Sequence, residues 1–313
     1  MNYTRRDLAK LAMAAFPAAT LSAAKLNSTF GGVQVGINAP YSFHNMADGA
    51  DDVLGYLKQT GIAAVELRAQ PVERALGATL PARLSAADRK KGASASRTDA
   101  VKAHEKWRLA RPMSAFKDFR KKWEDVGVKI QIVKWDDINT FTDDELDYCF
   151  NMSAALGAHA LSCEIPVSQT KRIGEFATKH KMMVGYHGHG NITDPEAFGK
   201  LSSWEQSMSY SKYNGANIDI GHFFAANGFT PSEWIKANHS RVTHVHLKDR
   251  KAKMGPGMPW GEGDTPIKEM LLLMKKEKYK FQATIELEYK IPEGSNVLAE
   301  ITKCVKYCQD VLS

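Results

Sequence analysis

Five short segments in the second half of the chain place histidine or carboxylate side chains at the ends of apolar runs. These residue types bind divalent cations and transfer protons near neutral pH. The segments are 161–164 (Leu-Ser-Cys-Glu), 186–190 (Tyr-His-Gly-His-Gly), 218–222 (Ile-Asp-Ile-Gly-His), 244–249 (His-Val-His-Leu-Lys-Asp) and 284–288 (Thr-Ile-Glu-Leu-Glu). Their recurrence indicates that the five segments contribute to one shared site.

Several of these residues are two positions apart, which places them on the same side of an extended strand. A single buried histidine or carboxylate is usually a hydrogen-bonded structural residue. Several of them in one partly enclosed space repel or desolvate one another unless a cation or protons compensate. We therefore expect one divalent metal ion, and the mixed ligand types suit Mn, Zn, Co, Fe or Mg. The pairs are His187 and His189, His244 and His246, and Glu286 and Glu288.

The elements that must position these residues alternate between strand and helix from Lys25 onward. Such alternation predicts a parallel sheet covered by helices. Eight repeats in this length favour a closed barrel, and no Gly-x-Gly-x-x-Gly motif follows the first strand, which argues against a dinucleotide-binding sheet. The expected strands are 33–38, 63–68, 129–135, 158–165, 182–189, 216–222, 242–248 and 281–288. The expected helices include 51–61, 142–156, 170–180, 195–207, 231–238, 266–278 and 296–312.

The predicted fold is therefore α/β, a single (β/α)8 TIM barrel over residues 25–313. Functional side chains in such barrels collect at the C-terminal ends of the strands, which is where the five segments lie. A capping box at Thr142 and Glu145 marks the start of one helix. Residues 70–126 are less regular and predict a helical excursion with a polar loop at 90–97, which would serve as a lid or an oligomer contact.

Residues 1–24 have the parts of a secretory signal. Arg5 and Arg6 precede a nearly uncharged stretch, Leu11–Ala24, which ends in the small residues Ser22-Ala23-Ala24. The start resembles a twin-arginine export signal, with Leu8-Ala9 in place of the more usual Phe-Leu. We expect removal of residues 1–24 and export to the periplasm. The alternative is an amphipathic N-terminal helix of a cytosolic protein.

The composition is that of an ordinary globular protein, with 313 residues, 43% of them hydrophobic, and a formal net charge of +7. Loss of residues 1–24 removes three basic residues and one acidic residue, which lowers the charge to +5. The basic residues are spread along the chain, so a solvated surface is favoured over nucleic-acid binding. No stretch is long and apolar enough for a membrane span, and we expect neither nucleic acid nor a membrane as partner of the mature chain.

The run from Tyr186 to Glu288 resembles the xylose isomerase-like TIM barrels, the group of sugar phosphate isomerases and epimerases. Four motifs carry the resemblance, and their order and spacing agree with the family. They are Asp219-Ile-Gly-His222, His246-Leu-Lys-Asp249, Gly261-Glu262-Gly263 and the strand ending at Glu286.

This resemblance implies that Asp219, His246 and Glu286 are metal ligands. The fourth family ligand is usually a Glu in a Glu-Asn-His setting on the fifth strand. This chain departs from that pattern, because it has His187-Gly188-His189 there. Either His187 or Glu164, on the neighbouring strand, is the fourth ligand. If His187 is the ligand, we expect Glu164 to act as a catalytic base.

The remaining site residues are expected to contact or activate the substrate. His222 resembles the family's substrate-contacting histidine, and Lys248 would stabilise an oxyanion, although a surface ion pair between Lys248 and Asp249 is an alternative. We expect His189, together with Glu164 and Glu286, to take part in proton transfer. Aromatic side chains near strand ends could stack on a pyranose ring. Substrate contacts are expected from Glu66, His244 and Trp260.

The family resemblance implies proton abstraction next to a carbonyl, leading to isomerisation, epimerisation or elimination. Export and the lack of a Gly-rich phosphate-binding loop favour an unphosphorylated keto-sugar or a 3-keto-glycoside as the small-molecule partner. Two other functions remain open, a metal-dependent apurinic-site endonuclease and a non-catalytic sugar-binding barrel. Members of this group often pair through their helices, so a homo-oligomer is possible.

Overall fold

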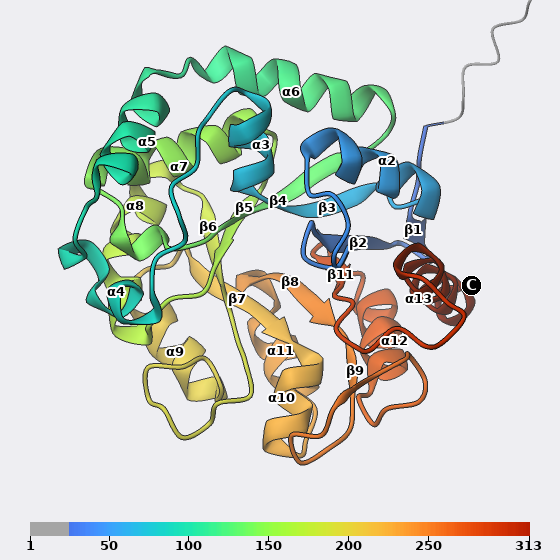
Figure 1. The fold of residues 1–313 in the computed structure, drawn as a ribbon. Helices are drawn as coiled ribbons and strands as arrows, with labels where there is room; N and C mark the ends of the chain where they lie inside the picture. Colours follow the sequence, from blue (N-terminus) through green and yellow to red (C-terminus); the bar gives the residue numbers. More distant parts are fainter. Residues whose placement is uncertain (1–24) are drawn as a thin grey trace, which may run out of the picture.

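The computed structural model describes residues 25–313, and the expected export signal lies outside them. Eight parallel strands form a closed barrel in the order β2, β3, β4, β5, β6, β7, β8, β11 and back to β2. The predicted single (β/α)8 barrel is thereby confirmed, and Figure 1 shows the strands inside a ring of helices. The strands are β2 (Val33–Ala39), β3 (Ala64–Arg68), β4 (Lys129–Trp135), β5 (Ala160–Cys163), β6 (Met183–His187), β7 (Asn214–Asp219), β8 (Val242–Leu247) and β11 (Gln282–Ile285).

The last barrel strand pairs with the first and so closes the barrel. Ile285 of β11 is in register with Ile37 of β2, which is in turn in register with Val65 of β3. A short strand, β1 (Thr29–Phe30), adds to the outer side of β2 in the antiparallel direction. The three residues at the closure are fully buried, because they contribute to the apolar core between strands and helices.

Helices cover the outside of the barrel, and α13 packs against both α12 and α2, so the end of the chain lies beside the first helix of residues 25–313 (Figure 1). The capping box of Thr142 and Glu145 is present at the start of α7, as predicted. Among residues 25–313, no helix has the length and apolar character needed to cross a membrane. The helices are α2 (Ala50–Thr60), α7 (Asp143–Ala155), α8 (Thr170–His180), α9 (Leu201–Tyr210), α10 (Ile220–Asn227), α11 (Ser232–Asn238), α12 (Ile267–Glu277) and α13 (Val297–Leu312).

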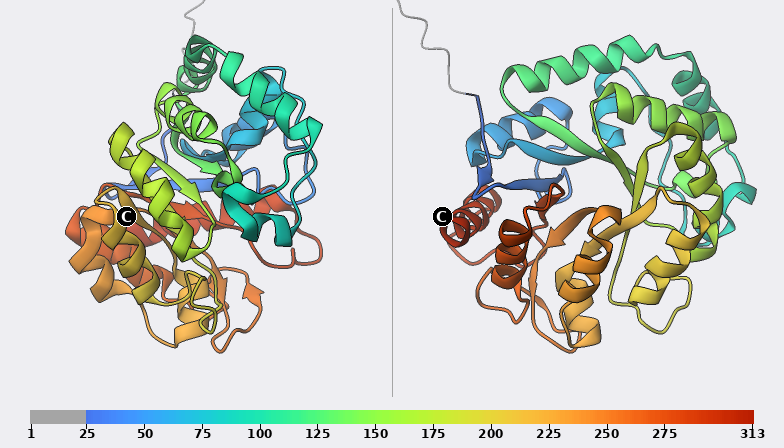
Figure 2. Two further views of the ribbon diagram at one scale, coloured as in Figure 1. Left: turned by 90° about the vertical axis from the view of Figure 1, so that its left-hand side faces the viewer. Right: turned by 180° about the vertical axis from the view of Figure 1, so that it is seen from behind.

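The expected helical excursion lies between β3 and β4 and covers one side of the barrel (Figure 2). Buried ion pairs attach it to the barrel: Arg108 contacts Glu73 at 2.8 Å and Glu145 at 2.8 Å. Because Glu145 belongs to α7, the excursion is fixed to the outer helices. Its helices are α3 (Ala69–Ala75), α4 (Ala86–Lys91), α5 (Asp99–Ala110) and α6 (Met113–Asp125).

Several predicted boundaries differ from the structure, among them those of β7, α9 and β11. The strand expected at 216–222 ends at Asp219, because the Asp219 carboxylate accepts a hydrogen bond from the His222 N–H at 2.8 Å and so caps α10. The helix expected at 195–207 begins only at Leu201, after a stretch of turns. β11 ends at Ile285, so the residues that follow it leave the sheet at the barrel mouth.

Candidate metal centre and active site

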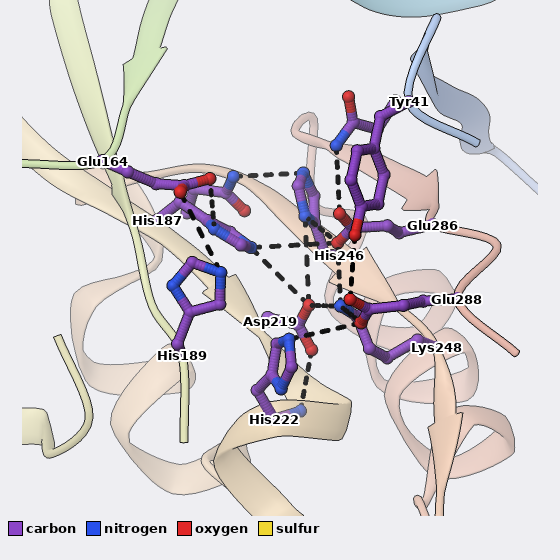
Figure 3. A network of polar contacts seen from close by, with 12 residues as sticks. Tyr41, Glu164, His187, His189, Asp219, His222, His246, Lys248, Glu286 and Glu288 are labelled. Carbon is purple, nitrogen blue, oxygen red and sulfur yellow. Dashed lines mark hydrogen bonds and ion pairs between the residues drawn. The ribbon is translucent and has the colours of Figure 1, made fainter. Parts of the chain in front are cut away.

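Four buried residues converge at the C-terminal ends of neighbouring strands. His187 ends β6, Asp219 ends β7, His246 lies in β8 and Glu286 follows β11. Each is at most 4% exposed, and each offers one ligand atom within 4.8 Å of the others. Figure 3 shows the four side chains directed at a common space. We call these residues the four-residue cluster.

The separations within the four-residue cluster are close to those expected around one cation. His187 Nε2 lies 3.6 Å from Asp219 Oδ2 and 3.8 Å from Glu286 Oε2, and His246 Nδ1 lies 4.0 Å from Asp219 Oδ2. Ligands about 2.1 Å from a tetrahedral ion are about 3.4 Å apart. One pair is closer, because His246 Nδ1 and Glu286 Oε2 share a hydrogen bond at 2.7 Å. A cation would replace that proton, so these residues fit a metal ion.

Two atoms that face each other in the cluster have no hydrogen-bond partner within residues 25–313. They are His187 Nε2 and Asp219 Oδ2. The ammonium of Lys248 is 2.9 Å from Asp219 Oδ2 but does not meet hydrogen-bond geometry there. Buried polar atoms are normally paired, so His187 Nε2, which has neither a hydrogen bond nor a close cation, and Asp219 Oδ2, which has only the Lys248 ion pair, fit a cation between them.

Negative charge is in excess around the cluster. Five carboxylates face two lysine ammonium groups and the protonated ring of His246, so a divalent cation would improve the local charge balance. The carboxylates belong to Glu66, Glu164, Asp219, Glu286 and Glu288, and the ammonium groups to Lys134 and Lys248.

Neighbouring charges override burial in setting the protonation of the cluster. Burial alone would raise the pKa of Glu286, but Lys248 and His246 hold it well below its usual range. Burial likewise opposes the charged form of His246, yet the carboxylates of Glu286 and Glu66 raise its pKa to about 10. Without a metal, His246 is therefore protonated between its two carboxylate partners.

Two carboxylates orient the cluster histidines from outside the cluster. Glu66 Oε2, on β3, lies 2.5 Å from His246 Nε2, and Glu164 Oε1, after β5, lies 3.1 Å from His187 Nδ1. Each contact uses the ring nitrogen that faces away from the cluster and leaves the other nitrogen for a cation. Of the two residues considered for the fourth position, the structure brings His187 into the cluster and places Glu164 beside it.

Further polar side chains surround Glu288, near the barrel mouth. The Lys248 ammonium forms an ion pair with the Glu288 carboxylate, and Tyr41 donates a hydrogen bond to Glu288 Oε1 at 2.9 Å. His222 Nε2 is 3.3 Å from Glu288 Oε2, and its Nδ1 contacts the guanidinium of Arg250. Figure 3 shows Tyr41, His222, Lys248 and Glu288 directly beside the cluster.

The predicted proton-transfer residues Glu164 and His189 lie next to the cluster and retain access to solvent. Their side chains are 38% and 50% exposed. The His189 ring lies 4.8 Å from that of His187 and 5.1 Å from that of His222 between centroids. The structure thus assembles the predicted ligands and predicted catalytic residues in one place.

Two of the residues expected to contact substrate are inaccessible. Glu66 and His244 are both 0% exposed, and His244 Nε2 is 3.3 Å from Glu66 Oε1. Because they lie inside the barrel against His246, they support that histidine and do not reach a substrate in the mouth. The prediction of substrate contact was wrong for both.

The third expected contact, Trp260, is also differently placed. Its ring packs edge-on against Tyr307 of α13 at a centroid distance of 5.7 Å, so its role is packing of the loop before α12 against that helix. The structure gives no stacking role at the metal centre to Trp260.

The possible surface ion pair between Lys248 and Asp249 is not formed. Both residues are buried, and the Lys248 ammonium is directed at the site. The Asp249 carboxylate instead accepts the N–H groups of Gly261 and Gly263 at 2.8 and 3.0 Å. It thereby holds the loop that follows a small hairpin of β9 (Asp249–Arg250) and β10 (Gly257–Met258).

The sequence analysis gave no role to several polar residues of the site. It paired Glu288 with Glu286 on one side of a strand but assigned it no function, although the two-residue spacing is a visible signal. Lys134 has a weaker one, as a cation at the apolar end of β4. Asn38, which donates to Glu286 Oε1 at 3.2 Å, has no signal beyond its place at the end of the first barrel strand.

The sequence model of the xylose isomerase-like TIM barrel family matches residues 159–306. This span contains the whole four-residue cluster. The family resemblance inferred from the motifs is confirmed for these residues. A comparison with curated proteins finds no match.

Solved structures with the same fold cover almost the whole barrel. A sugar phosphate isomerase/epimerase from Parabacteroides distasonis has a TM-score of 0.57 and 15% identity, covering 90% of this chain and 96% of that chain. The 3-keto-D-glucoside 4-epimerase YcjR from E. coli has a TM-score of 0.57 and 10% identity, covering 88% of this chain and 100% of that chain. The IOLI protein with a binding zinc atom has a TM-score of 0.59 and 13% identity, covering 90% of this chain and 98% of that chain. At these low sequence identities, the similarity shows a common fold only.

Proposed function

We propose that this protein is a divalent-metal-dependent enzyme that removes a proton next to a carbonyl of an unphosphorylated keto-sugar or 3-keto-glycoside. The observation that carries the proposal is the four-residue cluster, with its unpartnered His187 Nε2 and Asp219 Oδ2. The proposed outcome is isomerisation, epimerisation or elimination. Similar folds occur in an epimerase of a 3-keto-glucoside and in a zinc-bound protein, which is consistent with the proposal.

The proposed metal ligands are His187, Asp219, His246 and Glu286. A bound divalent cation would polarise the substrate carbonyl and stabilise the negative charge that develops when the neighbouring C–H loses its proton. Glu66 and Glu164 would hold the two histidine rings in the orientation required for binding.

Glu164 is the proposed proton acceptor. Its carboxylate is 38% exposed beside the cluster and is held by the Lys134 ammonium and by His187. It can therefore take the proton from carbon and return it to the adjacent carbon, whereas protonation of the same carbon on the opposite face would need a second proton donor. Lys248 and His222, on the other side of the cluster, are placed to hold substrate oxygens.

The proposal places this chemistry outside the cytoplasm. The twin arginine and the following uncharged stretch in residues 1–24 support export, and a periplasmic enzyme meets free sugars and glycosides. N-terminal sequencing of the protein recovered from the periplasm would test this, and a mature chain that still begins at Met1 would count against it.

The function is tested by hydrogen–deuterium exchange at carbon, followed by NMR in heavy water over ketoses, sugar phosphates and 3-keto-glycosides. We expect exchange with an unphosphorylated substrate, loss of exchange after EDTA treatment, and recovery on adding Mn or Zn. Glu286→Gln should lose exchange, whereas the exposed Glu277→Gln should retain it. Exchange only with phosphorylated sugars would contradict the substrate class, and a metal-loaded protein without any exchange would contradict the reaction.

A further inference from the structure

A second cavity, of about 210 Å³, lies between the excursion and the ends of β3 and β4. The segment 80–84 and helix α5 line one side. Arg68, Asp136 and Phe141 line the side toward the barrel. Since Arg68 ends β3 and Asp136 follows β4, the cavity lies at the same end of the barrel as the four-residue cluster.

The lining of this cavity is largely apolar. Leu80, Leu84 and Val101 come from the excursion, and Phe141 comes from the turn before α7. The Phe141 ring is covered by the Arg108 guanidinium, 4.3 Å from the ring centroid. A flat apolar group of a ligand would therefore contact aliphatic side chains and the edges of an aromatic ring.

The main charged groups around the cavity are already paired. The Arg108 guanidinium is engaged by Glu73 and Glu145, and Arg68 forms an ion pair with Asp136 at 2.5 Å. A second sugar ring would need several free donors and acceptors for its hydroxyl groups, and beyond these pairs the lining offers mainly the Arg83 guanidinium and the unpartnered Gln70 Oε1. An apolar ring can enter without leaving any of these charges unpaired.

The cavity is linked to the metal centre on two sides, by a neighbouring cavity and by side-chain packing. Asp136, Asp137 and Arg83 also line a neighbouring cavity of about 300 Å³ that reaches Glu164, the residue hydrogen-bonded to His187. On the other side, the Arg68 guanidinium lies 5.6 Å from the ring centroid of Tyr41, which is hydrogen-bonded to Glu288. The cavity is thus next to the site and not an isolated void.

We propose that this cavity binds an aromatic aglycone of a glycoside whose oxidised sugar ring lies at the metal centre. The inference rests on the proposed function and narrows its substrate class to aryl 3-keto-glycosides. The buried pairs of Arg108 keep α5 in position, so the cavity is formed before the ligand arrives. The excursion then acts as part of the substrate site in addition to its place in the fold.

The test compares phenyl and methyl 3-keto-β-D-glucopyranosides, which differ only in the aglycone. We expect the metal-loaded wild type to have a kcat/KM for exchange about tenfold higher with the phenyl substrate, because the cavity buries an aromatic ring. Val101→Trp places an indole in the cavity and should bring the phenyl-to-methyl ratio close to one. Lys102→Trp, on the exposed face of the same helix, is the matched control and should keep the wild-type ratio.

Binding without turnover provides a second readout. Calorimetric titration with phenyl β-D-glucoside and methyl β-D-glucoside should show the same preference in EDTA-treated protein, and Leu84→Ala should weaken the phenyl ligand selectively. An unchanged ratio in a folded Val101→Trp protein, or an equal loss with both substrates, would overturn the aglycone site. Absence of exchange with both substrates in the wild type would instead count against the proposed function, and these outcomes are distinguishable.

Discussion

His187 shows how one side chain is prepared for metal binding by its neighbours. Its Nδ1 faces Glu164 at 3.1 Å, whereas its Nε2 faces Asp219 and Glu286 and has no hydrogen-bond partner in residues 25–313. A carboxylate that accepts the proton of one ring nitrogen leaves the lone pair on the other. His246 is likewise held by a carboxylate, Glu66, at its Nε2, but its Nδ1 is hydrogen-bonded to Glu286 and becomes a ligand atom only when a cation replaces that proton. The ligand atoms are therefore selected by residues outside the cluster.

Asp219 has two separable roles, since one oxygen caps α10 and the other faces the cluster. Asp219→Asn keeps an acceptor for the His222 N–H but removes the negative charge, so we expect a folded protein that no longer retains metal. Metal content by elemental analysis, together with the thermal unfolding midpoint, measures both effects. Asp219→Ala should in addition lose about 1 kcal/mol of stability, because the cap is lost. Full metal occupancy in a folded Asp219→Asn protein would exclude Asp219 as a ligand.

Glu66 should affect metal affinity although it is buried away from the mouth. Glu66→Gln removes the charge that fixes the ring of His246 and should weaken metal binding about 10–100-fold. Titration of EDTA-treated protein with Zn or Mn gives the dissociation constants. The surface variant Glu277→Gln provides the comparison, and equal affinities in the two variants would argue against a positioning role for Glu66.

At the scale of elements, α5 is attached to the barrel mainly by polar contacts. Arg108 is buried and bridges Glu73 of α3 and Glu145 of α7. Burial of unpaired charges is costly, so this bridge matters most when one partner is missing. The same bridge defines one wall of the proposed aglycone site. Arg108 therefore affects both the stability of the excursion and the proposed preference of the protein for an aryl substrate.

Removal of the Arg108 charge should strongly destabilise the protein. Arg108→Met leaves Glu73 with only His104, and Glu145 with only Arg97, as charged partners. It should lower the free energy of unfolding by about 3 kcal/mol, the lower end of the range for a broken buried ion pair. Urea unfolding monitored by circular dichroism measures the change. Lys106→Met alters an exposed cation on the same helix, and its effect should stay within about 0.5 kcal/mol.

The pairing of Glu73 also predicts an acid-sensitive contribution to stability. Burial alone would raise the pKa of Glu73, but Arg108 and His104 hold it below its usual range. The contribution is fully present above about pH 4.3, the ordinary value of a glutamate, and is lost as the pH falls toward the lower folded value. Unfolding midpoints in urea between pH 7 and pH 3 should fall less steeply in Glu73→Gln than in the wild type. Parallel curves would show that Glu73 titrates alike in the folded and unfolded chains.

At the scale of the whole molecule, the metal centre joins parts of the chain that are distant in sequence. Strands β6, β7, β8 and β11 supply the four-residue cluster, while β3 supplies the supporting Glu66 and β2 the contacting Asn38. The four cluster residues meet because β6, β7, β8 and β11 pair side by side, and the pairing of β11 with β2 brings Asn38 and Glu66 to them. An unfolded chain offers no comparable site.

Metal binding should for this reason stabilise the folded state as a whole. At a free metal concentration of 100 times the dissociation constant, the expected gain is about 2.7 kcal/mol. Thermal unfolding of EDTA-treated wild-type protein should shift upward on adding Mn or Zn, and Asp219→Asn should not respond. An equal shift in both proteins would indicate binding away from the four-residue cluster.

The sequence predicts the barrel and most of the site because both follow from local regularities. Strand alternation indicates the side on which His187, Asp219, His246 and Glu286 project, and strand order brings their ends together. The depth of a side chain inside the barrel is harder to predict. His244 lies two residues before His246, about 6.6 Å closer to the N-terminal end of the strand, and is therefore buried below the mouth. The path of the excursion follows from long-range pairs such as Arg108 with Glu145, which have no local signature.

The pairing of β11 with β2 also has a consequence for the order of events during synthesis. Glu286 follows the last barrel strand, so a growing chain that has completed β8 already has His187, Asp219 and His246 but lacks the fourth member of the cluster. Until β11 has been made and pairs with β8, the nascent chain can hold a cation only through an incomplete set of donors. The strand that closes the barrel against β2 is also the strand that brings the fourth donor, so full metal capture is a late step in synthesis.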